Sequence, residues 1–104
     1  MSRNGRIGGA FVHALRQNAL AAGCCVQVQS CDWAPWASAT FAGARHRITL
    51  EAASTEAFDN WLAHLDEADL PVPGHLVADI AIAAVRCTGK VAKADIEALT
   101  VEAV

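Results

Sequence analysis

The sequence predicts an α+β fold, a two-layer sandwich with two helices on one face of a mainly antiparallel sheet. Two observations support this prediction. Two segments have helical apolar spacing, and each is followed by segments in which apolar and polar residues alternate. In addition, each half contains Phe-x-x-x-Leu, at 11–15 and 58–62, followed by a similar closing stretch, at 48–52 and 99–103. We expect the order α-β-β-β-α-(β)-β-β, with a possible internal repeat, although short matches also arise by chance in an alanine-rich chain.

The length and composition favour one folded domain spanning residues 1–104. The chain is 54 % hydrophobic and 18 % charged, a balance that excludes disorder. However, 23 of its 104 residues are alanine, which has little apolar surface to bury. We therefore expect a thin core, and we expect further apolar surface to be buried against a partner.

The first helix is predicted over residues 7–22. Phe11, Leu15 and Ala19 fall on one face of a helix, together with Val12 and Ala22. Gly23 follows as a C-cap.

Three strands are expected next, over 24–31, 36–42 and 45–52. The segment 32–35 separates the first two because Pro35 has no N–H for a ladder. Gly43-Ala44 is the expected hairpin turn. In the third strand we expect His46, Ile48, Leu50 and Ala52 to point inward, and Arg45, Arg47, Thr49 and Glu51 to point outward.

The second helix begins after Ser54, which is a suitable N-cap. An unbroken apolar stripe then follows at helical spacing, formed by Phe58, Trp61, Leu62 and Leu65. Leu70-Pro-Val-Pro73 cannot continue this helix. The expected order includes a short strand between this helix and the hairpin that follows.

A hairpin is predicted over the remaining residues. A strand over 75–87 places Leu76, Ile80 and Ile82 on one face with Ala78; a turn at 88–90 leads to a strand over 91–104. In that last strand, the apolar positions change parity after Ala98. We therefore predict a β-bulge near Ala98–Leu99.

No metal, cofactor or catalytic constellation is expected. The four cysteines, at 24, 25, 31 and 87, lack the paired spacing of a zinc site. A nucleophilic thiol at Cys25 or Cys31 would need a lowered pKa, and no basic residue stands near either in sequence. None of the four histidines has ligand spacing.

One cluster is a candidate ligand site: Trp33, Trp36, Arg45, His46 and Arg47. Aromatic and basic side chains together can hold an anionic ligand or a nucleic-acid strand. The alternative is structural: the arginines form cross-strand ion pairs, His46 lies at the edge of the core, and the tryptophans close one end of the sandwich.

Nucleic-acid and membrane partners are not expected. The net charge of −3 gives no general attraction to phosphate. Residues 1–68 resemble double-stranded-RNA-binding domains in element order alone, but a second helix opening Ser54-Thr-Glu56 repels phosphate. No stretch is long and apolar enough for a signal peptide or membrane span, so we expect a cytoplasmic protein.

Two functions remain open. The first is a non-enzymatic binding or assembly module that forms a homodimer through the hairpin 75–104, either edge to edge or across its Ala81/Ala83 face. The alternative is a small enzyme or anionic-ligand binder that uses the Arg/His/Trp cluster.

Overall fold

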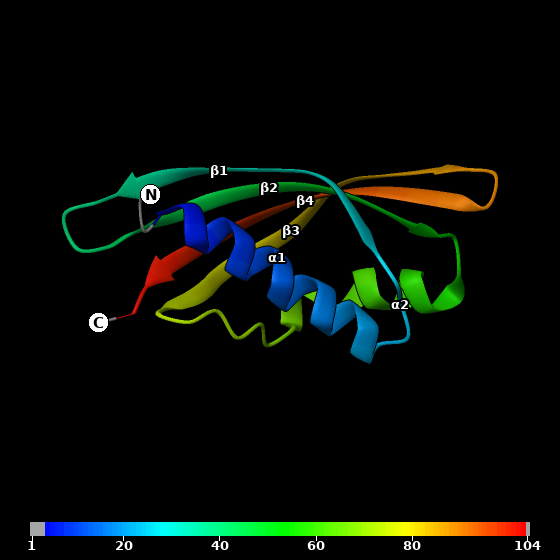
Figure 1. The fold of residues 1–104 in the computed structure, drawn as a ribbon, viewed down its shortest axis with the longest axis horizontal. Coiled ribbons are helices and arrows are strands. Elements are labelled where there is room, and N and C mark those ends of the chain that lie inside the picture. The colour runs from blue at the N-terminus through cyan, green and yellow to red at the C-terminus, as the bar shows by residue number, and fades with distance from the viewer. Residues whose placement is uncertain (1–3, 104) are drawn as a thin grey trace.

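Two units, each a helix followed by a hairpin, form the fold (Figure 1). The structure, a computed structural model, describes residues 4–103. The first unit contains α1 (Asn4–Ala21), β1 (Gln27–Ala37) and β2 (Ala42–Ala53). The second contains α2 (Glu56–His64), a 3-10 turn η1 (Leu65–Glu67), β3 (His75–Thr88) and β4 (Val91–Glu102).

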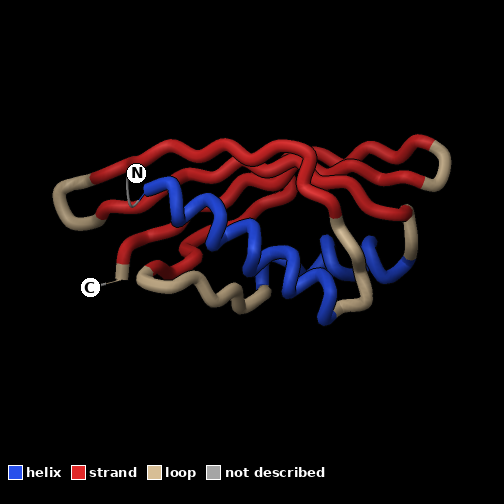
Figure 2. The backbone as a smooth tube through the Cα atoms, in the orientation of Figure 1, coloured by secondary structure: helices blue, strands red, loops and turns tan. Residues whose placement is uncertain are grey.

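The predicted two-layer α+β sandwich is confirmed. The four strands form one sheet in the order β1-β2-β4-β3, and every neighbouring pair is antiparallel. Both helices lie on the same side of this sheet, and no element of the described chain covers its other side (Figure 2). We call the covered side the inner face and the uncovered side the outer face.

Most of the apolar stripe predicted for α1 is buried, although Val12 is half-buried and Ala22 lies exposed after the helix; Gly23 is the C-cap as predicted. Phe11, Leu15 and Ala19 are fully buried. Gly23 has a φ of +86°, and the N–H of Cys24 donates to the carbonyl of Ala19 at 2.8 Å. This arrangement is a Schellman C-cap, which suits glycine because side chains disfavour positive φ.

The second helix begins one residue later than predicted. Thr55, not Ser54, is the N-cap: its Oγ1 accepts a hydrogen bond from the N–H of Phe58 at 3.1 Å. The expected stripe then packs on the sheet, with Phe58, Trp61 and Leu65 buried. Trp61 also reaches α1, because its indole N–H donates to Oδ1 of Asn18 at 2.9 Å.

The core lies between the helices and small side chains of the two central strands. The inward positions of β4 are occupied by Ala92, Ala94, Ile96, Ala98 and Thr100. Because four of these five side chains are small, large aromatic and leucine side chains from the helices can pack close to the strand backbone. The thin, alanine-rich core expected from composition is therefore present.

The predicted break between two strands in the first half is wrong. Residues 32–35 continue the strand, so β1 runs unbroken through Pro35. β1 is an edge strand, where a residue without an N–H can be tolerated. The hairpin turn consequently lies at residues 38–41, where Ser38 Oγ accepts from the N–H of Phe41, and not at Gly43-Ala44.

The β-bulge predicted in the last strand is also wrong. The inward parity of β4 continues through Ala98 because buried Thr100 takes the next inward position. The bulges lie in β3, at Ala78 and Ala83, and in β1, at Gln29. The face predicted for Leu76, Ala78, Ile80 and Ile82 is therefore wrong. The bulge at Ala78 leaves Leu76 pointing outward, opposite Val101, whereas Val77, Ile80 and Ile82 point inward. Val104, the last residue of the predicted strand, lies outside the described residues.

The two units share an architecture, but the similar closing stretches do not occupy equivalent positions. Ile48 and Leu50 point inward from β2 and are fully buried. Leu99 and Val101, their sequence counterparts, point outward from β4. The similar sequences of residues 48–52 and 99–103 therefore do not correspond to equivalent structural positions in the two halves.

The backbones of β2 and β4 approach each other so closely at Gly43 that a side chain at this position is expected to destabilise the fold. A Cβ at Gly43 would collide with the main-chain oxygen of Thr100, whereas one at Gly9 in α1 would meet no atom within 4 Å. We expect Gly43→Ala to lower the free energy of unfolding by about 2–3 kcal/mol. Gly9→Ala should raise it by up to about 1 kcal/mol, because alanine favours helix.

Urea denaturation of both variants, followed by circular dichroism, measures these changes. Equal stabilities for Gly43→Ala and the parent chain would contradict the strand approach described above.

Candidate functional site

The five residues of the predicted cluster do not form one site, because the sheet separates them. Trp33 and His46 are paired across β1 and β2 and point to the inner face, where Trp33 packs against Gly8 of α1. Arg45 and Arg47 point to the outer face. Trp36 lies three positions beyond Trp33 and therefore on the alternate side of β1. Its indole N–H donates to the main-chain oxygen of Thr100 at 3.3 Å.

The outer face contains a shallow hollow of about 640 Å³. All four strands contribute to it, and its outward side chains are those of Asp32, Ala34, Arg45, Arg47, Asp79, Ala81, Glu97 and Leu99. Three of these side chains are carboxylates and two are guanidinium groups. The hollow is therefore mixed in charge, without a net attraction for anions.

Most charges on the outer face are paired across strands. Arg47 contacts Glu97 at 3.1 Å, Arg86 contacts Asp95 at 3.2 Å, and Lys93 contacts Glu51 at 3.9 Å. Hydrogen bonds from Thr49 and Arg86 lower the pKa of Asp95. These pairs fix side-chain positions, but each contributes little to stability because it is exposed.

Arg45 differs from these cations because its cross-strand neighbours are Ala34 and Leu99. Within residues 4–103, it forms no ion pair. Asp79, one strand beyond Leu99 in the same row, also has no ion pair among the side chains of residues 7–103. The row therefore holds one free cation and one free anion at separate positions. The expected cross-strand pairing is present for Arg47 and absent for Arg45.

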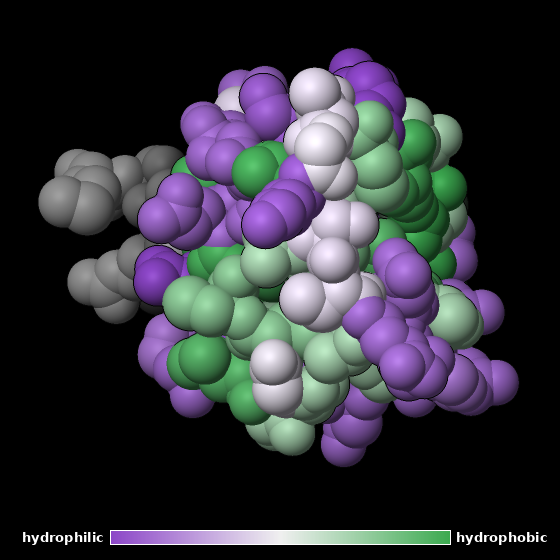
Figure 3. Space-filling view, turned by 90° about the vertical axis from the view of Figure 1, so that its right-hand side faces the viewer, coloured by the Kyte–Doolittle hydropathy of each residue, from purple (hydrophilic) through white to green (hydrophobic). Residues whose placement is uncertain are grey.

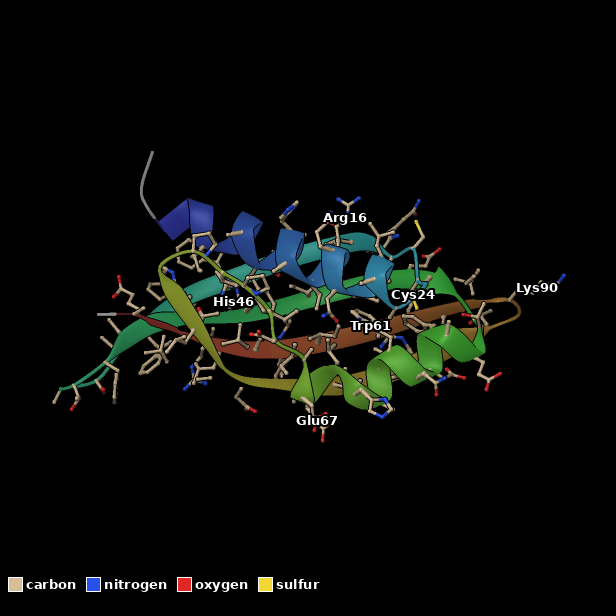
Figure 4. All side chains as sticks on the ribbon, turned by 90° about the horizontal axis from the view of Figure 1, so that it is seen from below. Arg16, Cys24, His46, Trp61, Glu67 and Lys90 are labelled. Atoms are coloured by element: carbon tan, nitrogen blue, oxygen red, sulfur yellow. The ribbon has the colours of Figure 1, made fainter. Side chains whose placement is uncertain are left out.

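On the inner face, His46 forms a buried polar contact between β2 and β4. Its ring is 2 % exposed and stacks on Phe11, with 4.6 Å between ring centroids. His46 Nε2 lies 3.0 Å from Thr100 Oγ1, and that hydroxyl donates to the carbonyl of Ala44 at 3.4 Å. Since the hydroxyl hydrogen is used in this way, Nε2 of His46 is the donor to Thr100. Figure 4 shows His46 on the sheet beneath α1.

The environment of His46 keeps the imidazole neutral. Burial, with a smaller contribution from His75, lowers its pKa from 6.5 to about 4. Its Nδ1 is buried and has no hydrogen-bond partner in the described chain. A ring this enclosed is not exposed to a ligand in solution, and its contacts join β2, β4 and α1.

Thiol and metal chemistry receive no support from the described residues. Burial raises the pKa of Cys24, and burial together with Asp32 raises that of Cys31. A raised pKa reduces the thiolate that a nucleophile or metal ligand needs. No group of three or more His, Cys, Asp or Glu side chains in the described part of the chain could hold a metal ion.

The two open sheet edges differ in composition. On β1, the edge contains Asp32, Pro35 and the bulge at Gln29, all features that discourage pairing with another strand. On β3, the segment Leu76–Val85 contains nine apolar residues and one charged residue, Asp79. Ile80 is the only buried residue of that segment, and Leu76 is 65 % exposed.

Exposed apolar surface continues at the end of the molecule where α2 and the β3–β4 hairpin lie. Figure 3 views this end, and hydrophobic surface is visible there between hydrophilic projections. Val85 and Val91 of the hairpin are 47 % and 39 % exposed. The β3 edge and its hairpin are therefore the most apolar exposed part of the described strands.

Sequence reasoning missed Thr100. The change of parity predicted after Ala98 turns Leu99 and Val101 inward and Thr100 outward, whereas Thr100 is the buried residue. The i, i+2 pattern of β4 could have placed Thr100 inward if a buried hydroxyl had been allowed at that position.

Comparison with known proteins adds no relative: no family model, curated protein or solved structure matches this chain. None of the described helices is long and apolar enough to cross a membrane.

The buried imidazole makes stability depend on pH. Unfolding restores the His46 pKa from about 4 to 6.5, so the unfolded state binds a proton between these values when the folded state does not. Stability is therefore full above pH 6.5, falls as the pH drops, and levels off below pH 4. The loss from this residue is about 3 kcal/mol.

Urea denaturation at a series of pH values tests this expectation. His46→Gln cannot titrate, so its stability should fall less steeply between pH 6.5 and pH 4 than that of the parent chain. Parallel curves for the two proteins would show that His46 is not neutral and buried.

Proposed function

We propose that this protein is a non-enzymatic assembly module that forms a homodimer through the open edge of β3. One observation supports the proposal above all others: the apolar segment Leu76–Val85 lies at a sheet edge with its backbone groups unpaired on one side. A long apolar edge strand readily pairs with another strand. A second strand of defined identity can accept and donate the hydrogen bonds that the backbone N–H and C=O groups of this edge leave unformed.

The contrast between the two edges strengthens this proposal. Both edges contain a carboxylate and at least one bulge, but β1 also contains proline, whereas Leu76–Val85 has no proline and no lysine, and nine of its ten residues are apolar. Two copies of β3 can pair antiparallel about a two-fold axis, because each strand then offers the same surface to the other. Such pairing would join two four-stranded sheets into one of eight strands.

An interface made mainly by one strand pair is small. Interfaces of this class bind weakly, with a dissociation constant in roughly the micromolar range. The proposed dimer should therefore dissociate on dilution.

Sedimentation velocity over a series of concentrations tests this proposal, and two exposed valines of the same hairpin provide matched variants. Val85 lies on the edge strand β3, and Val91 lies on the internal strand β4. A lysine at an edge opposes strand pairing. We expect Val85→Lys to weaken the dimer about tenfold and Val91→Lys to leave it unchanged.

Circular dichroism of both variants controls for folding. A parent chain that remains monomeric at high micromolar concentration would refute the proposal. In that case, the bulges at Ala78 and Ala83 would be sufficient to protect the edge.

A second candidate function is anion binding in the outer-face hollow. Arg45 favours it, since this guanidinium lies between Ala34 and Leu99 without a carboxylate partner in the described chain. Asp32, Asp79 and Glu97 oppose it, because they line the same hollow. We therefore rank anion binding below self-association.

An NMR titration with inorganic phosphate, in which backbone amide chemical shifts are recorded, tests the second candidate function. Binding at Arg45 predicts saturable shifts at residues 34, 45 and 99 that are lost in Arg45→Gln and kept in Lys90→Gln. Shifts of equal size in all three proteins would remove the candidate.

A further inference from the structure

The charges of β3 are arranged so that one antiparallel register is complementary to itself. Asp79 and Arg86 are the carboxylate and the guanidinium of this strand. When two copies of β3 pair about a centre between Ile82 and Ala83, Asp79 of each copy lies opposite Arg86 of the other. A register centred on Asp79 or on Arg86 would instead place like charges opposite each other, which destabilises a strand pair.

The bulge at Ala83 makes this register possible. Asp79 and Arg86 are seven positions apart, an odd spacing that puts two residues on opposite faces of a regular strand. Both nevertheless point to the outer face, because Asp79 is paired with Leu99 and Arg86 with Lys93. The extra residue of the bulge restores their common face.

The positions between the charges also match by face. Ile80 would lie opposite Val85, and both point inward, where Ile80 is paired with Ala98 and Val85 with Ala94. Ala81 would lie opposite Ala84, and both point outward. The half-exposed side chain of Val85 would then be covered by Ile80 of the other copy.

We infer that a second copy of this chain binds along β3 in this register, held by two symmetric Asp79–Arg86 ion pairs. The inference rests on the proposed homodimer and specifies its interface. Asp79 is available for the contact, since it has no ion pair among the described side chains, those of residues 7–103. Arg86 already contacts Asp95 on the outer face at 3.2 Å, and a guanidinium has donors for a second carboxylate.

Complementary charge reversals test the register. In Asp79→Arg, both cross-dimer pairs become Arg–Arg, and in Arg86→Glu both become acidic pairs. We expect each variant alone to dimerise about tenfold more weakly than the parent chain. An equimolar mixture restores both pairs, because the arginines at 79 and 86 of one variant then lie opposite the acidic side chains at 86 and 79 of the other.

Native mass spectrometry resolves the two variants by mass and should show a heterodimer in excess of both homodimers. This rescue separates the interface from folding, because loss of the Arg86–Asp95 pair within one copy cannot be repaired by adding a second variant. Circular dichroism confirms that each variant is folded.

The outcomes separate the two proposals. If the parent chain dimerises but both variants dimerise as it does, or their mixture shows no preference for the heterodimer, the register is wrong and the homodimer stands. If the parent chain is monomeric, both proposals fail.

Discussion

The antiparallel pairing of β2 with β4 is the contact on which the rest of the structure depends. Each half of the chain provides one helix and one hairpin, and this central pairing joins the halves into one sheet. Its register decides which side chains meet. Ile48 faces Ile96 at the centre of the core, and His46 meets Thr100 near one end. A shift by one residue would turn every inward side chain of one strand outward.

Local features of the fold were predictable from sequence, and pairings between distant residues were not. The helical stripe ending at Gly23 and the stripe at Phe58 depend on residues within a few positions of each other, and both are present. The break at residues 32–35 was predicted from Pro35 alone. Whether proline ends a strand depends on its place in the sheet, and the position of β1 at an edge follows from contacts that local spacing does not contain.

The candidate site illustrates the same limit. Trp33, Trp36, Arg45, His46 and Arg47 are close in sequence, but alternation along strands divides them between two faces. The residues that Trp36, Arg45, His46 and Arg47 meet across the sheet come from β4, which no local pattern places beside them. Thr100 shows the physical difficulty most clearly. Polarity alone assigns threonine to the outer face. Here the Thr100 hydroxyl is buried, and its hydrogen bonds with His46 and Ala44 offset the free-energy cost of removing it from water.

The bulges of β3 have two opposed consequences at the open edge. A bulge twists the strand, which usually makes an edge a poorer template for a second strand. The bulge at Ala83 also brings Asp79 and Arg86 to one face, and a regular strand with the same sequence would lack that self-complementarity. A charged residue or a proline among the exposed apolar positions of β3 would also prevent pairing with another strand, and it would do so without interrupting the hydrogen bonds between β3 and β4. Under the proposed homodimer, the bulge therefore has a second consequence: it selects the register in which the two charges of this apolar edge meet their opposites.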